Sequence, residues 1–163
     1  AIVAAEATTS GGPIFGYTRG AAPHDWLGLT GGSIGMAIPL AVGAAVACPD
    51  RKVLCIQSDG GGMYTNQALW TLAREGLDVA TVILSNRRYK ILEHEYFKTG
   101  ANTLGAKADK LFDIGNPDID WAHLAQGMGM EGHRCTEAED FTAKLEAALA
   151  TDGPQLIDAV YSG

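Results

Sequence analysis

Hydrophobic positions in this chain form two kinds of pattern that alternate along its length. Short apolar runs rich in β-branched residues, typical of strands buried on both faces, are separated by stretches with helical spacing. The short runs predict six strands, at residues 1–5, 26–29, 53–57, 79–84, 131–135 and 154–161. This alternation predicts an α/β fold that is doubly wound, with a mainly parallel sheet and helices on both faces.

The stretches between the strands predict helices at 33–47, 65–74, 89–97, 121–128 and 137–150. Pro39 lies inside the first of them, so this helix either starts later or is kinked at the proline. Thr65 is a plausible N-cap for the second helix, which Gly76 would end. Residues 8–23 and 99–118 are rich in loop-forming residues, and we expect both to be loops.

Length and composition narrow the function classes. The 163 residues suit one domain, and a hydrophobic content of 47% is enough for a full core. A net charge of −7 argues against a partner that is a nucleic acid, and no apolar run is long enough to cross a membrane. Three widely spaced cysteines and no visible secretory signal favour a cytoplasmic protein. Because the first residue is Ala1, we expect a processed chain or an excerpt.

Polar residues directly follow two of the central predicted strands. Asp59 follows strand 53–57 within the glycine-rich segment 58–62, and Asn86 follows strand 79–84. If these strands are neighbours, both side chains face one pocket at the sheet edge where α/β proteins bind ligands. Carboxylate and amide oxygens suit Mg²⁺ or Ca²⁺, and glycines let backbone amides approach a phosphate. The alternative interpretation is an ordinary pair of turn residues beside tight glycine bends.

The same residues resemble a known motif. Asp59-Gly60, followed after 27 residues by Asn86, is similar to the thiamine-diphosphate-binding motif, which reads Gly-Asp-Gly, a spacer and Asn-Asn. The sequence departs from that motif at Ser58 and Ser85, which replace its first Gly and its first Asn. The resemblance implies that Asp59 and Asn86 ligate Mg²⁺ through their side-chain oxygens. It also implies a third metal ligand, the backbone carbonyl of Arg88.

The resemblance extends over essentially the whole chain. Residues 31–39 are similar to the glycine-rich segment of acetolactate synthases and benzoylformate decarboxylases. This similarity implies that the Gly32 carbonyl binds the aminopyrimidine and that Ile34 wedges the cofactor into a bent shape. Ordinary core packing at a helix start remains the alternative for Ile34. The residues predicted to bind the cofactor are Thr8, Thr9, Gly32, Ile34, Gly60, Gly61 and Tyr89, and Tyr64 is a further candidate to line the pocket.

The resemblance also implies an activity and partners. Residues 1–163 would form a single domain, the C-terminal pyrophosphate-binding domain of a larger enzyme that decarboxylates a 2-oxo acid and then ligates it. The cofactors would be thiamine diphosphate and Mg²⁺, with FAD possible in the full enzyme. The glutamate that activates the cofactor would lie in an N-terminal pyrimidine-binding domain of a second subunit, in a homodimer or homotetramer. We expect Glu6 to lie at the wrong end of its strand for that role, so no catalytic residue is assigned.

Three alternatives remain at this stage. A simple decarboxylase resembling benzoylformate decarboxylase would use the same cofactor without ligation. A non-catalytic assembly domain that kept the fold is favoured by Ser58 and Ser85, whereas the intact Asp59 and Asn86 argue against it. A generic nucleotide-binding domain is weakened because no G-x-G-x-x-G follows the first predicted strand.

Overall fold

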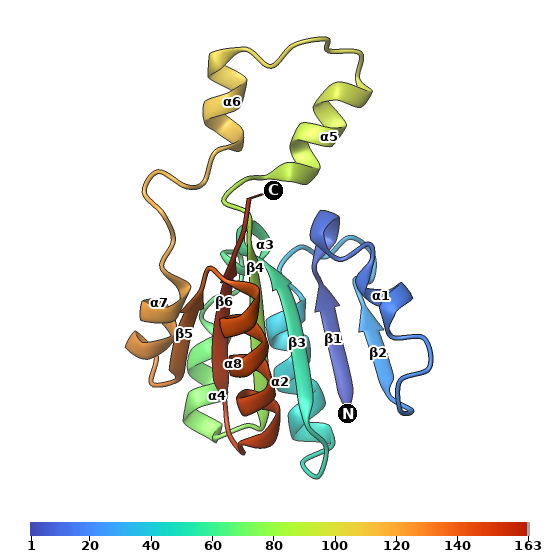
Figure 1. The fold of residues 1–163 in the computed structure, drawn as a ribbon, viewed down its shortest axis with the longest axis vertical. Coiled ribbons are helices and arrows are strands. Elements are labelled where there is room, and N and C mark those ends of the chain that lie inside the picture. Colours follow the sequence, from blue (N-terminus) through green and yellow to red (C-terminus); the bar gives the residue numbers. More distant parts are fainter. Residues whose placement is uncertain (163) are drawn as a thin grey trace.

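A computed structural model describes residues 1–162 of the chain and confirms the doubly wound α/β fold (Figure 1). Its six strands form one sheet in the order β2-β1-β3-β4-β6-β5, and every neighbouring pair is parallel. The strands are β1 (Ile2–Glu6), β2 (Asp25–Gly28), β3 (Val53–Ser58), β4 (Val79–Ser85), β5 (Glu131–Cys135) and β6 (Gln155–Val160). The two strands that precede the polar motif, β3 and β4, are therefore neighbours at the centre of the sheet.

Helices cover the two faces of the sheet unequally. The helices are η1 (Thr8–Ser10), α1 (Ile14–Tyr17), α2 (Ala37–Ala47), α3 (Asp59–Gly62), α4 (Ala68–Glu75), α5 (Lys90–Lys98), α6 (Ala106–Phe112), α7 (Trp121–Gly127) and α8 (Ala138–Ala150). Side chains of α2, α4 and α7 form the main core with one face of the sheet, and α8 packs on the other face over β4, β5 and β6. Alternate residues of β3 serve the two faces, since Val53 and Cys55 join the main core while Ile56 packs on the opposite side.

Two helix starts differ from the prediction. Helix α2 begins at Ala37 rather than at Ser33, which places Pro39 in its first turn, where a missing N–H costs nothing. The prediction that Thr65 is an N-cap is wrong, because α4 begins at Ala68 and the Thr65 hydroxyl donates to the carbonyl of Gly35 at 2.5 Å. The end of α4 is confirmed, since Gly76 adopts the left-handed conformation with φ 58°.

Both predicted loops contain helical turns. Residues 8–23 include η1 and α1, and residues 99–118 include α6. The segment 106–112 reads AKADKLF, in which alanine, lysine and leucine favour a helix despite the glycines around it. The short helix α3 was not predicted, since its sequence DGGG contains three glycines and glycine disfavours helices.

Helices α5 and α6 form an arm that extends beyond the carboxyl end of the sheet (Figure 1). Backbone hydrogen bonds close the base of this arm. The N–H of Tyr89 donates to the carbonyl of Phe112 at 2.8 Å, and the N–H of Ile114 donates to that of Arg87 at 3.0 Å. The arm is thus a helical hairpin attached directly to the end of β4. No helix within residues 1–162 is long and apolar enough to cross a membrane.

Asp158 is an acidic residue buried near the end of the sheet that carries β5 and β6. Asp158 on β6 is fully buried, and one of its carboxylate oxygens accepts a hydrogen bond from the Ser85 hydroxyl at 2.5 Å. Burial raises the pKa of Asp158 to about 6, although the Ser85 hydrogen bond and the nearby Arg134 act in the opposite direction. The charged form of Asp158 therefore destabilises the fold.

We expect Gly132→Ala to destabilise the protein by about 3 kcal/mol, because α7 crosses β5 at this glycine. A Cβ atom on Gly132 would lie 2.4 Å from the carbonyl oxygen of Ala122, which is backbone and has little freedom to move. Gly43→Ala is the matched control, since Gly43 lies inside α2 with open space around it. Alanine at this helical position should increase the free energy of unfolding by about 0.5–1 kcal/mol. Urea unfolding of both variants checks the prediction, and equal effects would contradict it.

We expect Asp158→Asn to stabilise the protein near neutral pH by about 2–3 kcal/mol, because asparagine can still accept from Ser85 but carries no charge. A raised pKa in the folded state stabilises the fold only below the unfolded pKa, and this contribution is lost as pH rises through about 6. The advantage of the variant should therefore vanish toward about pH 4. Thermal unfolding across this pH range measures it, and a pH-independent difference would contradict the assignment.

Candidate functional site

A cavity of about 230 Å³ lies at the carboxyl ends of β1, β3 and β4. It gathers the predicted site residues Thr8, Thr9, Ile34, Asp59, Gly60, Gly61, Asn86, Arg88 and Tyr89. Gly32 lies outside its lining, in an exposed part of the loop that carries Ile34, with φ +67°. The sheet order explains the gathering, since β1, β3 and β4 are adjacent and all end at this edge.

The Asp59 carboxylate joins the ends of the two central strands. One oxygen accepts from the N–H of Gly60 at 2.8 Å, and the other accepts from the N–H of Arg87 at 2.7 Å, in the turn after β4. Burial raises the pKa of this carboxyl, and the backbone hydrogen bonds partly offset the effect. A divalent cation at this carboxylate would compensate the cost of burying its charge.

The second oxygen donor is prepared in a similar way. The side-chain oxygen of Asn86 accepts from the N–H of Arg88 at 3.0 Å, which fixes the amide at the end of β4. The Arg88 guanidinium is bound to Glu93 at 3.0 Å and to Asp109 at 2.7 Å. Within residues 1–162 no group of three or more His, Cys, Asp and Glu side chains is placed to hold a metal. A cation here would therefore rely on one carboxylate, one amide and backbone or ligand oxygens, a set that suits Mg²⁺.

The glycines after Asp59 are required by close packing. A Cβ atom on Gly60 would lie 2.6 Å from the Tyr89 ring, and one on Gly61 would lie 2.7 Å from both the Gln57 amide nitrogen and the Ser58 hydroxyl. Gly60 and Gly61 also line the cavity. The segment thus presents bare backbone to a ligand because neighbouring side chains leave no room for anything larger.

Glu6 lines the cavity, although the sequence analysis assigned it no role there. It is the last residue of β1 and is 2% exposed. Its carboxylate accepts from the N–H of Gly35 at 2.7 Å and from the N–H of Ala37 at 3.2 Å. The carboxylate therefore holds the loop between β2 and α2 against the sheet edge.

This loop is also held from its other side. The Thr65 hydroxyl donates to the carbonyl of Gly35, and a Cβ atom on Gly35 would lie 2.8 Å from that of Tyr64. Gly35 itself has φ +87°, which favours glycine. Between these anchors Ile34 is 56% exposed and lines the cavity, so its side chain is not part of the core at a helix start.

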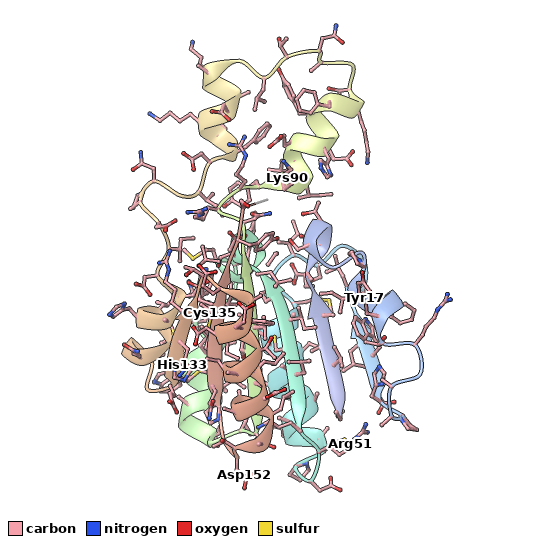
Figure 2. All side chains as sticks on the ribbon, viewed as in Figure 1. Tyr17, Arg51, Lys90, His133, Cys135 and Asp152 are labelled. Atoms are coloured by element: carbon pink, nitrogen blue, oxygen red, sulfur yellow. The ribbon has the colours of Figure 1, made fainter. Side chains whose placement is uncertain are left out.

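The first turn of α5 forms a wall that the sequence analysis did not identify. Lys90, Ile91 and Leu92 line the cavity, and Figure 2 shows Lys90 at the base of the arm, next to the sheet edge. Ser58 and the candidate Tyr64 complete the lining. The sequence signal that could have identified Lys90, Ile91 and Leu92 was their position directly after Tyr89, at the start of a predicted helix.

The chain is similar to known proteins over most of its length. The family model described as thiamine pyrophosphate enzyme, C-terminal TPP binding domain, matches residues 12–159. A Mycobacterium tuberculosis protein, provisionally named acetolactate synthase large subunit IlvX, is 52% identical over 98% of this chain, which spans 31% of that protein's length. Benzoylformate decarboxylase of Pseudomonas aeruginosa is 34% identical over 78% of the chain, which covers 23% of that enzyme.

A solved structure extends the likeness to three dimensions. The thiamine diphosphate-dependent 4-hydroxybenzoylformate decarboxylase of Rhodococcus jostii RHA1 superposes with a TM-score of 0.82 and 32% identity. The match covers 99% of this chain and 29% of the decarboxylase. The family match covers most of the chain, and the cavity lies where the sequence motif predicted it. The chain belongs to the thiamine pyrophosphate enzymes, as their C-terminal TPP-binding domain.

Proposed function

We propose that this chain binds thiamine diphosphate together with Mg²⁺, and that the protein decarboxylates a 2-oxo acid with carboligation, as an acetolactate synthase does. The observation that carries the proposal is the convergence of Asp59, Asn86 and the bare backbone of Gly60 and Gly61 on one cavity. When bound, thiamine diphosphate supplies the electron sink for the loss of carbon dioxide. The fit rests on hard oxygen donors beside an unobstructed backbone surface.

Each predicted residue has a specific task in this proposal. The Asp59 and Asn86 side chains and the Arg88 carbonyl would hold Mg²⁺. The diphosphate would be surrounded by residues that follow the strand ends, namely Thr8, Thr9, Gly60, Gly61 and Tyr89. The loop fixed by Glu6 would present Ile34 to the rings of the cofactor and the Gly32 carbonyl to its aminopyrimidine. All these tasks concern binding and orientation.

The chemistry needs a further group that this cavity does not provide. The Glu6 carboxylate is already bound to two backbone amides, so it is poorly placed to activate the cofactor. We infer that the activating glutamate comes from a pyrimidine-binding domain of a second subunit, in a homodimer or homotetramer, with FAD held outside this domain if it is bound at all. The chain spans less than a third of the relatives that it matches, which supports its role as one domain of a larger enzyme.

A simple decarboxylase is the second candidate. The observations that favour it are the two benzoylformate-type decarboxylases among the relatives, with identities of 34% and 32%. Product analysis with pyruvate and with an aryl 2-oxo acid separates the candidates. A two-substrate ligation product supports the synthase, and an aldehyde alone supports the decarboxylase.

Asp59→Ala should abolish Mg²⁺-dependent binding of thiamine diphosphate, because it removes the only carboxylate in the proposed ligand set. Calorimetric titration of the complete natural protein measures the binding, with and without Mg²⁺. Asp50→Ala is the matched control, since Asp50 is an exposed aspartate in the turn before β3, far from the cavity, and should bind like the wild type. If the wild-type protein fails to bind, the proposed function is wrong and the assembly-domain alternative takes its place.

Glu6→Ala should weaken binding of thiamine diphosphate at least tenfold and destabilise the protein by about 2–3 kcal/mol, because it leaves two buried amides without an acceptor. Glu6→Gln keeps one acceptor oxygen and should recover much of both losses. Calorimetry and urea unfolding measure the two effects. If the alanine variant binds as tightly as the wild type, the loop does not depend on this carboxylate.

A further inference from the structure

The cavity has an uneven distribution of charge. Two carboxylates, those of Glu6 and Asp59, lie in its lining, and the whole chain carries a net charge of −7. If a diphosphate and one Mg²⁺ bind here, the diphosphate and Asp59 together carry more negative charge than one divalent cation neutralises. A positive side chain at the cavity would offset this excess, since electrostatic attraction is strong in a partly buried site.

Two cationic side chains line the cavity, and they differ in their partners. Arg88 is bound by two carboxylates, Glu93 at 3.0 Å and Asp109 at 2.7 Å, so its charge is already compensated. Lys90 has one carboxylate near it, the other oxygen of Glu93, at the long distance of 3.5 Å. Glu93 binds Arg88 more closely, through Oε2, than it binds Lys90, through Oε1. The Lys90 ammonium is therefore available to bind another anion.

The position of Lys90 fits an anionic ligand. Lys90 lines the cavity and is the first residue of α5. The N-terminus of a helix carries partial positive charge, which adds to the charge of the lysine at this wall of the cavity. Its side chain is 30% exposed, which leaves it partly desolvated and still free to turn toward a ligand. Figure 2 places Lys90 where the arm meets the sheet, at the edge that also carries Asp59 and Asn86.

We propose that Lys90 binds the terminal phosphate of the diphosphate and so neutralises the charge that Mg²⁺ leaves. This inference rests on the proposed function. It adds a residue of the arm to a binding site otherwise built from the ends of β1, β3 and β4. The arm thereby takes part in holding the cofactor.

The test compares thiamine diphosphate with thiamine monophosphate, which lacks the terminal phosphate. Calorimetric titrations with the complete natural protein and Mg²⁺ should show that Lys90→Gln raises the Kd for thiamine diphosphate about tenfold. Its affinity for the monophosphate should stay unchanged, and the salt dependence of diphosphate binding should become weaker. Lys90→Arg should retain most of the affinity. Lys107→Gln, on an exposed part of the same arm, is the matched control and should behave like the wild type.

Each other outcome overturns the inference in a distinguishable way. If the wild-type protein binds neither compound, the proposed function is wrong, and so is the role of Lys90. If the wild type and Lys90→Gln bind thiamine diphosphate equally well, only the proposed role of Lys90 is wrong. If Lys90→Gln weakens the binding of both compounds equally, the lysine stabilises the shape of the cavity and does not bind the terminal phosphate. A raised KM for the 2-oxo acid with unchanged cofactor affinity assigns Lys90 to the substrate carboxylate instead.

Discussion

The Asp59 carboxylate is the interaction on which the site depends. Its two short hydrogen bonds, to Gly60 and Arg87, join the end of β3 to the turn that follows β4. That turn contains Asn86 and Arg88 and leads directly into the arm. A single buried acid thus joins two strand ends and anchors the turn that leads to α5. Its burial is unfavourable in isolation, and a cation at the carboxylate would offset this cost.

A second carboxylate organises the other half of the cavity. Glu6 holds Gly35 from the sheet, and Thr65 holds the same residue from the segment that follows α3. Each end of the cavity, one with the predicted metal ligands and one with Ile34, is therefore held by hydrogen bonds between a side chain and backbone groups. A site of this kind orients a ligand mainly by the positions of rigid elements.

The sequence predicted the sheet and most of the cavity because both follow from local patterns. Apolar runs located all six strands, and the placement of Asp59 and Asn86 after two of them required only that the strands be neighbours. Tertiary contacts explain the errors. Thr65 looks like a helix cap locally, but α4 begins three residues later, and the Thr65 hydroxyl donates to the carbonyl of Gly35, thirty residues away, instead of accepting from a helix N–H. The contacts of Glu6 were not predicted, because the partners of a carboxylate at a strand end depend on which amides face it, and these belong to the loop before α2. Helix α6 was missed because its flanking glycines suggested a loop.

The arm connects to the rest of the domain chiefly through its base. The backbone bonds between residues 87–89 and 112–114 close the hairpin without help from the strands of the sheet, whose order is complete without it. The sheet and the Asp59 contacts therefore do not involve the arm beyond that base, while the first turn of α5 forms a cavity wall. In mechanical terms, the arm beyond its base is a separate attachment to the sheet rather than a part of it.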